Sequence, residues 1–567
     1  MLLINPAQEK FGGFLSRYVP VGIPVAIGCI AAYLKKHGIA VNVVDDEITD
    51  ITPSVLREKV QGLEKPYIFG LSCLTAHVVR GYALSRMIKA EFPNSIVVAG
   101  GLHPTALPDE ALGLDTIDYV VRGEGEETML KLYRAIRSGE DVAPILGVSY
   151  KRDGRVVHNP EAPLIPELDD IPIFPYDLFN NPKYDMGFIC TSRGCPYKCT
   201  YCSQRMLTGT TYRFKSAERI VQELDVLINE YGQKQIVFQD DNFCFKQKRV
   251  IEVCEAMIAA GLHKKCAFSI QTRADNFQAG FAPIMAAAGF KHVGFGMETG
   301  VNRLASLIGK GETVEQHVEA TKLAKQHGMS VSLFMIFGLP TETDDDRETS
   351  YRVVQGMKVQ ASKYNNLIPY PGTPIYTDLK KTDRVHILPG WSNFNSTLSV
   401  TRSIFDRTPL PYVPETTSEW QLKRDIIKYN LKTYLKKEAF LSIITGKEGP
   451  GWYRLPDKWF LRPLELFHVG KIGVNVIVNM VMSYLPLSIT EPFMTWLNPE
   501  MKRRRRVADA ASEFKGSQWS AETARAKTAL LKGAKAEREK ARQTIALPVI
   551  QGPAKGPDVE ETAQPSR

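Results

Sequence analysis

Two series of short apolar runs, each alternating with stretches of helical periodicity, are the feature that most constrains the fold of this chain. The first series occupies residues 1–138 and contains five strand-like runs separated by helical patterns. Continuous apolar strands between helices are typical of a parallel sheet covered by helices on both faces. We therefore predict a doubly wound, Rossmann-like α/β domain at residues 1–138. The five runs are LLINP (2–6), AVNVVDD (40–46), YIFGLSC (67–73), SIVVAGG (95–101) and DYVVRGEG (118–125).

The second series begins at Gly187 and contains six strand-like runs with helical segments between them. Six such units predict a partial (β/α)6 barrel at residues 187–385, with its chemistry at the carboxyl ends of the strands. Residues 139–186, between the two series, are rich in proline, carry a hairpin signal at KRDGR (151–155), and read as a linker. The six runs are GFICTS (187–192), QIVFQD (235–240), CAFSIQT (266–272), KHVGFG (291–296), VSLFMIFG (331–338) and YNNLIPY (364–370).

The chain beyond residue 385 lacks the alternation of strand-like and helical runs. Residues 386–500 are helical and aromatic in pattern, so we predict a helical C-terminal region there, followed by a basic, partly disordered tail at 501–567. Residues 501–545 carry thirteen Lys and Arg against five Asp and Glu, which accounts for most of the formal net charge of +9. The body of the protein is therefore nearly neutral, and we do not expect it to bind nucleic acid.

An uncharged stretch in the C-terminal region, Ile472–Thr490, has two interpretations. It is interrupted by Pro486 and contains Asn475 and Asn479, so it is a poor match for a membrane span of roughly 20 apolar residues. It could be a buried helix of the C-terminal region. It could also be an interfacial membrane helix, which the basic run Lys502–Arg506 just downstream would favour.

The nine cysteines divide into two groups. Three lie within eight residues, at Cys195, Cys199 and Cys202, and the other six are scattered in apolar surroundings where core packing explains them. Nine cysteines are too few for a disulfide scaffold of this size, so the pattern suits a reducing compartment. Since MLLINP reads as a strand and not as a signal peptide, we expect a cytoplasmic protein, with possible membrane association through the C-terminal region.

The spacing Cys-x-x-x-Cys-x-x-Cys limits the metal chemistry of the first group. Structural zinc requires four ligands, usually in spaced pairs, and iron–sulfur clusters are normally held by four thiolates. Three thiolates without an obvious fourth ligand would leave one iron of a cubane cluster open. That iron could chelate the amino and carboxylate groups of a bound cofactor. The competing interpretation is three unligated cysteines on a loop.

This spacing, with the aromatic Tyr201 before the last cysteine, resembles the signature of the radical S-adenosylmethionine (SAM) superfamily, over about residues 187–380. The resemblance implies a [4Fe–4S] cluster held by the three cysteines, with SAM on the open iron. It also implies that one electron cleaves SAM to methionine and a 5′-deoxyadenosyl radical, which abstracts hydrogen from a substrate. A flavodoxin or ferredoxin would be a suitable electron donor.

Candidate SAM-binding residues share one position, since they lie at or just beyond a predicted strand end or beside the cysteines. The family places polar groups near the SAM amine after the second strand. An arginine at the third strand end can meet a carboxylate by a bidentate contact, and an acid at the fourth is suited to accept from ribose hydroxyls. A glycine-containing stretch after the fifth strand lies near adenine. In chain order these residues are Tyr201, Asp240 or Asp241, Gln271 and Arg273, Glu298, and Ile336 with Gly338. PYPGTPIY (369–376) resembles the segment that closes the barrel in the cobalamin-linked branch, or is simply a Pro-Gly turn.

The first domain resembles the cobalamin-binding domain of cobalamin-dependent radical SAM enzymes, through PVGIPVAIGCIAAYLKKHG (20–38), GGLHPTALPDE (100–110) and DYVVRGEGEET (118–128). Glycine-rich loops at strand ends allow a large flat cofactor to approach the backbone. No histidine lies in an Asp-x-His-x-x-Gly pattern, so cobalt is expected to lack a histidine beneath it, unless the domain is only a scaffold. The candidate cobalamin-binding residues are Ser72, Thr75, Gly100, Gly101, His103, Gly123, Glu124, Gly125 and Glu126.

The two resemblances together imply a cobalamin-dependent radical SAM methyltransferase. One SAM would supply a methyl group to cobalamin, and a second would generate the radical that activates an unreactive carbon of a lipid-, tetrapyrrole- or natural-product-like small molecule. A second interpretation keeps the cofactors without methyl transfer, as in the anaerobic magnesium-protoporphyrin ester cyclase and ring-rearranging relatives. A third is a membrane-associated scaffold with a residual cluster. The substrate and the carbon attacked do not follow from the sequence.

Overall fold

The computed structural model describes residues 1–8, 21–395, 408–436 and 459–497. All of them lie within one compact unit, Met1–Met501. The basic tail predicted at 501–567 lies outside the described residues.

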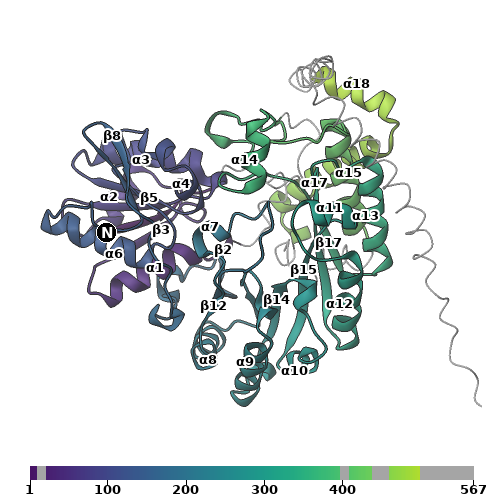
Figure 1. Ribbon diagram of the computed structural model, residues 1–567, viewed down its shortest axis with the longest axis horizontal. Coiled ribbons are helices and arrows are strands. Elements are labelled where there is room, and N and C mark those ends of the chain that lie inside the picture. Colours follow the sequence, from purple (N-terminus) through teal and green to yellow (C-terminus); the bar gives the residue numbers. More distant parts are fainter. Residues whose placement is uncertain (9–20, 396–407, 437–458, 498–567) are drawn as a thin grey trace, which may run out of the picture. The chain divides into compact units, whose positions relative to one another are not determined.

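The N-terminal domain is built on a seven-stranded sheet with the order β3-β1-β4-β5-β6-β7-β8 (Figure 1). The first five strands in this order pair in parallel, which confirms the doubly wound prediction. The last two form the KRDGR hairpin, which the sequence suggested as part of a linker. In the structure this hairpin pairs with β6 in antiparallel fashion and extends the sheet. The strands are β1 (Leu2–Asn5), β3 (Asn42–Asp45), β4 (Ile68–Ser72), β5 (Ile96–Gly100), β6 (Tyr119–Val121), β7 (Val148–Arg152) and β8 (Arg155–His158).

Helices cover both faces of this sheet, and the strands are apolar for that reason. Along β1, Leu3 belongs to the core shared with two contacting helices, α1 and α6, whereas Leu2 and Ile4 belong to the core on the opposite face with α2 and α3. Side chains alternate between the faces of a strand, so both alternating sets must be apolar here. The helices are α1 (Val25–Lys36), α2 (Pro53–Lys59), α3 (Val78–Glu91), α4 (Leu102–Ala106), α5 (Pro108–Leu112) and α6 (Glu126–Ser138).

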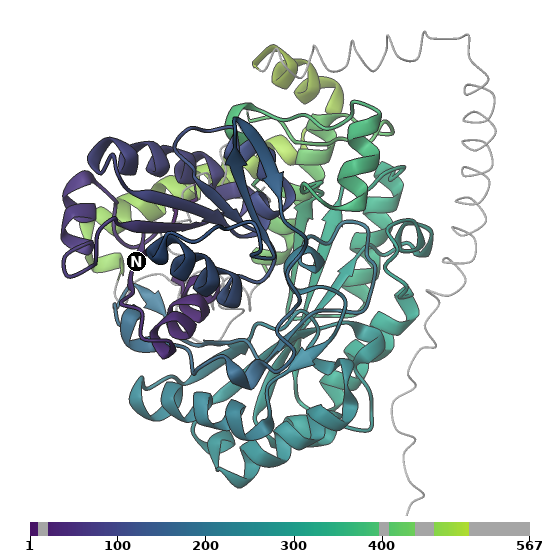
Figure 2. The same cartoon turned by 60° about the vertical axis from the view of Figure 1, so that its left-hand side comes forward.

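The second sheet has six parallel strands in simple chain order, β10-β13-β14-β15-β16-β17, and this confirms the partial barrel. Figures 1 and 2 show these strands side by side with helices along their outer side. The strands are β10 (Phe188–Ile189), β13 (Gln235–Phe238), β14 (Ala267–Thr272), β15 (Phe290–Glu298), β16 (Ser330–Phe337) and β17 (Ala361–Asn366). The helices that follow them include α8 (Ala217–Asp225), α9 (Gln247–Ala259), α10 (Ala282–Ala287), α11 (Asn302–Leu307), α12 (Val314–Gln326), α13 (Asp344–Gly356) and α14 (Pro374–Lys381).

Two short strand pairs and one short helix complete the region around the cysteines. A parallel pair joins β2 (Val21–Gly22) to β9 (Tyr184–Asp185), and an antiparallel pair joins β11 (Ser192–Arg193) to β12 (Arg213–Phe214). The helix α7 (Arg205–Thr208) lies between β11 and β12 in the chain. The cysteine loop is therefore enclosed by a small ribbon.

The C-terminal helix α15 (Glu419–Tyr434) packs on the edge strand β17. The buried side chain of Asn430 donates a hydrogen bond to the carbonyl of Tyr364 at 2.8 Å and accepts one from its N–H at 3.1 Å. Arg347 of α13 adds an ion pair with Asp425 at 2.8 Å. Backbone groups on the outer edge of β17 thus find partners in a helix, as buried peptide groups require.

Two further helices, α17 (Pro463–Tyr484) and α18 (Leu487–Leu497), follow α15, and both contact it. In the described residues, α17 is the one helix long and apolar enough to cross a membrane by length and composition. Only 17% of its most apolar stretch is buried in the protein. The interpretation of this stretch as a buried helix is therefore wrong.

Candidate functional site

The inner face of the barrel retains accessible surface at the level of the strand ends. On β14, Phe268 and Ile270 are buried whereas Gln271 is exposed, so alternate residues point to the two sides of the sheet. On β15 the inner positions include Gly294 and Gly296. A Cβ on Gly296 would lie 2.7 Å from the carboxylate of Glu298. Because these glycines have no side chains, the inner face of β15 has room for the side chains of Glu298 and Lys310.

The cysteine loop is held in place from both sides. The N–H groups of Thr191 and Ser192, just upstream, donate to Asp240 at 2.6 and 3.0 Å. Within the loop, the N–H of Thr200 donates to the carbonyl of Ile308 at 2.9 Å. Gly194 has φ of +88°, and a side chain there would collide with the backbone of the adjacent ribbon. Glycine is therefore required immediately before the first cysteine.

The chemistry of the donor set fits an iron–sulfur cluster. Cys199 is buried, while Cys195 and Cys202 are half-buried. Burial, together with the Asp241 carboxylate and the Cys199 thiol, raises the pKa of the thiols of Cys195 and Cys202. In the part of the chain that the structure describes, no three His, Cys, Asp or Glu side chains surround a common point. A cubane presents a separate iron to each thiolate, so its ligands need not converge on one point.

A cation lies beside the buried thiol. Nη1 of Arg273 is 3.9 Å from Sγ of Cys199, and its guanidinium is 3.5 Å from the centre of the Tyr197 ring. The same arginine donates to Asp275 at 3.0 and 2.8 Å. Arg273 therefore places a buried positive charge directly beside the cysteine loop.

The two acids after the second strand have different surroundings. Asp240 is buried, accepts hydrogen bonds from the segment before the cysteine loop, and lies 3.4 Å from Arg249. The side chain of Asp241 is exposed at the end of the strand, although many protein atoms surround it. Burial, followed by the neighbouring Asp240 carboxylate, raises the pKa of Asp241 to about 6. Of the two alternatives that the sequence left open, Asp240 is taken up by contacts within the protein, and Asp241 keeps an exposed carboxylate.

Three of the predicted SAM residues are joined in one chain of polar contacts. The hydroxyl of Tyr201 donates to Oε1 of Glu298 at 3.0 Å, and Nζ of Lys310 lies 3.5 Å from the same oxygen. Lys310 also lies 3.1 Å from Oε2 of Glu312, and Arg273 lies 3.6 Å from that oxygen. The cysteine loop, the third strand end and the fourth strand end therefore meet here.

The buried charges in this chain of contacts pair with one another. Lys310, Glu312, Arg273 and Glu298 are all buried, so each needs an opposite partner. Burial raises the pKa of Glu298, and the Lys310 ammonium opposes that rise. Burial lowers the pKa of Lys310, but the two carboxylates more than offset this and raise it. With Asp275, which pairs with Arg273, the group holds two cations and three carboxylates beside the cysteine loop.

Sequence reasoning missed Lys310 and Glu312. They lie in the tetrapeptide GKGE (309–312), more than a hundred residues beyond the cysteines, and nothing in that spacing points to them. Two sets of hydrogen bonds bring their loop to the site. The N–H and hydroxyl of Thr200 donate to the carbonyl of Ile308, and the N–H groups of Ala274 and Asp275 donate to Glu312 at 2.6 and 3.2 Å. The available sequence signal was the pair of glycines, Gly309 and Gly311, on either side of the lysine. In the structure both have positive φ, a backbone conformation that favours glycine.

The remaining predicted SAM residues lie apart from this chain of contacts. Gln271 is exposed at the end of β14. Ile336 is half-buried on β16 and pairs with Asn365 of β17. Gly338 has φ of +82° just beyond β16, where its N–H donates to Glu342 at 2.5 Å. Ile336 keeps part of its apolar side chain accessible, and Gly338 turns the chain just beyond the strand.

The strand order of the N-terminal sheet identifies a binding edge. Across the sheet its parallel strands lie in the order β3-β1-β4-β5-β6. From β1 the chain continues to β3 on one side and then to β4 on the other, so the order reverses between β1 and β4. Ligands of such sheets bind at the carboxyl ends of the strands at this reversal. Ser72 ends β4, and Thr75 begins the short helix that follows. Both lie in the expected loop.

The loops after β4 and β5 are bonded to each other. The N–H of Cys73 donates to Gly100 at 2.8 Å, and the N–H of His103 donates to Cys73 at 3.1 Å. Gly101 has φ of +92°, and a Cβ there would lie 2.8 Å from the carbonyl of Cys73. This close approach requires glycine.

His103 already has partners on both ring nitrogens. Its Nδ1 lies 3.3 Å from the hydroxyl of Thr75, and its Nε2 lies 3.2 Å from Glu110. Glu110 also accepts from the indole of Trp391 at 3.0 Å. Burial would raise the pKa of Glu110, but its hydrogen bonds to His103 and Trp391 bring it below its usual value. The completely buried imidazole therefore supports the loops and does not present a free nitrogen.

The loop after β6 is directed to the barrel. Gly123 has φ of +75°, and Gly125 lies so close to α1 that a Cβ would meet Ile30. Arg193 pairs with Glu124 at 3.1 Å and with Glu126 at 2.6 Å.

These carboxylates are nearly inaccessible, and a second arginine, Arg213, lies 2.8 Å from Glu124. Arg193 stands two residues before Cys195. The loop after β6 is thus fixed to the cysteine loop, through arginines that the sequence analysis did not single out.

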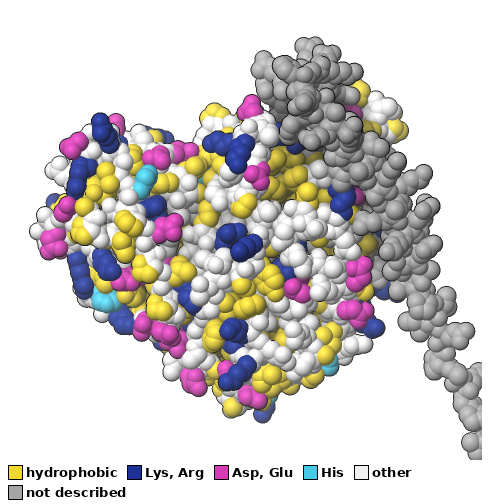
Figure 3. All heavy atoms as spheres, viewed as in Figure 1, with side chains coloured by type: hydrophobic (Ala, Val, Ile, Leu, Met, Phe, Trp, Pro, Cys, Tyr) yellow, Lys and Arg dark blue, Asp and Glu magenta, His cyan; other side chains and the backbone are white. Residues whose placement is uncertain are grey.

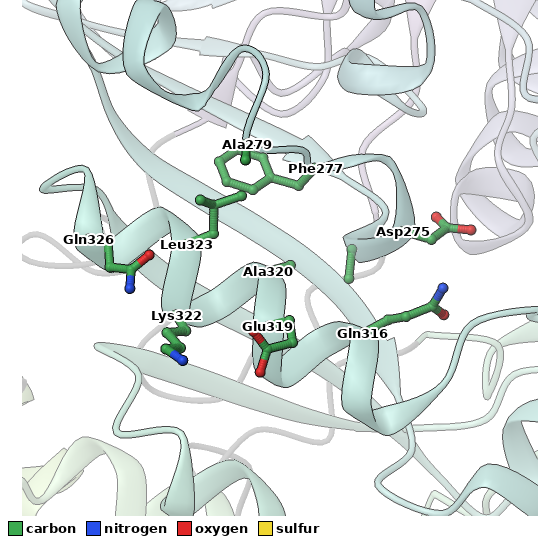
Figure 4. A pocket seen from close by; sticks show the side chains of 10 residues that line it. Asp275, Phe277, Ala279, Gln316, Glu319, Ala320, Lys322, Leu323 and Gln326 are labelled. Carbon is green, nitrogen blue, oxygen red and sulfur yellow. The ribbon is translucent and has the colours of Figure 1, made fainter. Parts of the chain in front are cut away.

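Two surface cavities lie elsewhere. One, of about 380 Å³, lies between α12 and the segment around Phe277, and is lined by side chains such as Glu319 and Lys322 (Figure 4). The other, of about 520 Å³, is lined by residues after β1 and β3 and by Arg80 of α3. None of the predicted site residues lines either cavity, so the inner face of the barrel is the better candidate for the catalytic site.

Comparisons with known proteins agree with this division of the chain. Residues 189–354 match the radical SAM superfamily, and residues 15–132 match the B12 binding domain. The uncharacterized methyltransferase PH0819 of Pyrococcus horikoshii is 33% identical over 456 residues, which cover 79% of this chain and 95% of that protein. The anaerobic magnesium-protoporphyrin IX monomethyl ester cyclase of Rubrivivax gelatinosus is 28% identical over 394 residues, which cover 67% of this chain and 70% of that protein.

Solved structures share the fold. The radical SAM methyltransferase TsrM from Kitasatospora setae, with cobalamin and a [4Fe-4S] cluster bound, has a TM-score of 0.59 at 20% identity, covering 67% of this chain and 77% of that one. The cobalamin-dependent radical SAM enzyme OxsB, with aqua-cobalamin and SAM bound, has a TM-score of 0.61 at 16% identity, covering 88% and 83%. At these identities the likeness concerns the fold.

Proposed function

This chain belongs to the cobalamin-dependent radical SAM enzymes, and from that membership we propose that it transfers a methyl group to an unactivated carbon of a small-molecule acceptor. Its cofactors are a [4Fe–4S] cluster, SAM and cobalamin. When bound, they supply a 5′-deoxyadenosyl radical and a transferable methyl group. The acceptor class we propose is lipid-, tetrapyrrole- or natural-product-like.

The residues of the chain take distinct parts in this proposal. Cys195, Cys199 and Cys202 would hold the cluster. Asp241 would accept from the SAM amine, and Glu298 would accept from the ribose hydroxyls. Gln271 and Arg273 at the third strand end would contact the SAM carboxylate. Ile336 and Gly338 would contact adenine.

The loops that end β4, β5 and β6 would bind cobalamin. Their candidates are Ser72, Thr75, Gly100, Gly101, His103 and Gly123 to Glu126. Because His103 is fully engaged by Thr75 and Glu110, we propose that its part is to fix the loops and not to ligate cobalt.

One observation carries the proposal furthest. Arg193 of the cysteine loop is paired with Glu124 and Glu126 of the loop after β6. A methyl group can reach a substrate radical only if the two cofactors lie close to the same space. The paired loops support that closeness, and the burial of both carboxylates supports a fixed geometry that limits the entry of water.

A second candidate function is an oxidative cyclisation or rearrangement without methyl transfer. It is favoured by the similarity to the magnesium-protoporphyrin ester cyclase of Rubrivivax gelatinosus. It would use the same cysteine loop and the same barrel face.

Labelled SAM separates the two functions without knowledge of the acceptor. The protein, reconstituted anaerobically with iron, sulfide and cobalamin, would be incubated with methyl-labelled SAM and a reductant. We expect 5′-deoxyadenosine together with label in the cobalamin fraction. Formation of 5′-deoxyadenosine with no label in that fraction would favour the cyclase, and absence of both products would contradict either enzyme.

Partners and location complete the proposal. The reaction needs a one-electron donor, for which we propose a flavodoxin or ferredoxin. We propose a cytoplasmic enzyme with peripheral membrane contact through the C-terminal region. Reduction of the cluster by purified flavodoxin, followed by its electron paramagnetic resonance signal, tests the first statement.

A further inference from the structure

The inner side of the helix α17 carries buried polar side chains beside half-buried apolar ones, and its outer side is largely apolar. The half-buried apolar side chains are Val476, Val478 and Met482. Asn475, Asn479 and Ser483 follow one another at intervals of four residues, lie on one face, and are buried. On the outer side, Val474 is 64% exposed and Ile477 is 55% exposed. A helix on the surface of a water-soluble domain shows the opposite arrangement. The outer side of α17 is therefore suited to an apolar environment.

The apolar surface continues onto α18. Trp496 is 74% exposed, and Ile489 and Phe493 are also exposed. Figure 3 shows hydrophobic side chains at the surface where Figure 1 places α18. Soluble proteins rarely expose apolar surface of this extent without a partner. The other exposed apolar side chains of the two helices are Leu464, Leu466, Phe467, Met480, Val481, Tyr484 and Leu485.

The inner side of α17 is fixed to the enzyme. Arg424 of α15 donates to the carbonyls of Ser483 and Leu485 at 2.9 and 2.6 Å. Trp420 of α15 donates to Thr490 of α18 at 3.0 Å. Since α15 in turn packs on β17, one side of α17 is always covered by protein.

This one-sided packing excludes a membrane span. Twenty-two residues make a helix of roughly 33 Å, which is long enough to cross a bilayer. A spanning helix, however, needs lipid or other spanning helices around it, and α17 lies along α15 of the catalytic unit. Only its outer side can enter lipid, to the depth of an interfacial helix.

Charge indicates which surface this side would meet. Residues 459–497 contain only two acids, Glu465 and Glu491, and Glu465 is buried. The basic run Lys502–Arg506 follows in the sequence. Clusters of basic residues beside an apolar helix attract the anionic headgroups of a bilayer. A second copy of this chain would bring the same positive charges together, so a bilayer is the better occupant.

We propose that the outer faces of α17 and α18 bind the surface of an anionic lipid bilayer, with both helices lying in its plane. The apolar side chains enter the boundary between headgroups and acyl chains, and the positive charge of Lys502–Arg506 in the sequence favours anionic headgroups. This inference assigns the peripheral contact of the proposed function to one helix face, and it does not depend on the reaction catalysed.

Vesicle flotation of the reconstituted full-length protein tests the proposal. The probes are vesicles of phosphatidylcholine alone and of phosphatidylcholine mixed with an equal amount of phosphatidylglycerol. The substitutions are V474Q with I477Q on the outer face of α17. The control is V318Q, at an apolar surface position on α12 that is 37% exposed. We expect the double variant to bind mixed vesicles on the order of tenfold more weakly, and V318Q to bind as the unaltered protein does.

Salt separates the two parts of the contact. High salt should weaken binding of the unaltered protein in part, because it screens the basic run but not the apolar face.

Three results would overturn the proposal: no flotation of the unaltered protein with mixed vesicles, equal flotation of the double variant, or a dimer that the double variant dissociates. The last would assign the face to a second copy. Equal 5′-deoxyadenosine formation by all three proteins shows that each is folded and keeps the membrane question separate from the reaction.

Discussion

The barrel interior and the outer face of α17 both depart from the rule of apolar inside and polar outside, but in different ways. In the barrel, Lys310 and Glu312 are buried charges that find partners within the protein. On α17, Val474 and Ile477 face outward and find none in the described residues. Buried charges that pair within the protein can support a cofactor. An exposed apolar face requires a contact from outside the chain. The comparison yields four predictions.

The largest effect is expected from the cysteine loop. Cys199→Ala should remove the cluster and lower 5′-deoxyadenosine formation at least about a hundredfold, since no protein-derived radical source replaces it. Iron content and product formation measure this. Cys254→Ala, in the buried core of α9, is the matched control and should keep its iron. Equal loss of iron in both variants would contradict the assignment of the cluster.

The second-largest effect is expected on stability, from the buried ion pairs of Lys310. Lys310→Met leaves Glu298 and Glu312 without their shared cation, which should cost about 3–5 kcal/mol of unfolding free energy. Lys310→Arg should retain most of the stability, and Lys322→Met on the exterior of α12 should change little. Chemical denaturation of the three variants measures this order. A stable Lys310→Met variant would show that the charges are not coupled.

A smaller effect should follow pH. The pKa of Asp241 is raised to about 6, so its carboxylate is present above that pH and protonated below it. If it holds the SAM amine, SAM affinity should fall as pH drops through about 6. An acid with a raised pKa binds more protons in the folded state, so it lowers stability as pH rises from about 4 to 6.

Asp241→Asn should therefore abolish the pH dependence of SAM binding and raise the melting temperature at neutral pH. Calorimetric titration with SAM and thermal melts across this pH range measure both effects. Asp153→Asn, in the turn of the β7–β8 hairpin, is the control. A pH profile that survives in Asp241→Asn would assign the titration to another group.

The smallest effect is expected on the other side of the comparison. V474Q with I477Q should change the unfolding free energy by less than about 0.5 kcal/mol per site, because neither side chain is packed in the core. The same chemical denaturation experiment measures it. A large loss of stability would mean that the outer face is held by the protein itself, and the contrast with the barrel would disappear.

Much of the architecture follows from the sequence, because apolar runs and cysteine spacing are local signals. The eleven predicted strand runs of the two α/β series all contain strands. The sequence does not predict which side chains contact one another. Asp240 and Asp241 are neighbouring acids of the same type in the sequence, and only the folded positions of Thr191, Ser192 and Arg249 distinguish them. Lys310 reaches the cysteines through a loop more than a hundred residues away.

Composition also could not decide how α17 is placed. An uncharged helix can be a core element or an interfacial one, and the choice depends on which face its neighbour covers. That neighbour, α15, covers the polar stripe. The Arg193 pairs with Glu124 and Glu126 were equally hidden, since they join residues far apart in the chain.

The side chain of Asn430 has a consequence for the size of the barrel. Its amide offers one donor and one acceptor to Tyr364, in the way that a peptide group of an adjacent strand would. At that point the sheet cannot recruit a seventh strand, from this chain or from another molecule, without first displacing a helix. The C-terminal region thereby limits the width of the barrel and protects its last strand from edge-to-edge aggregation.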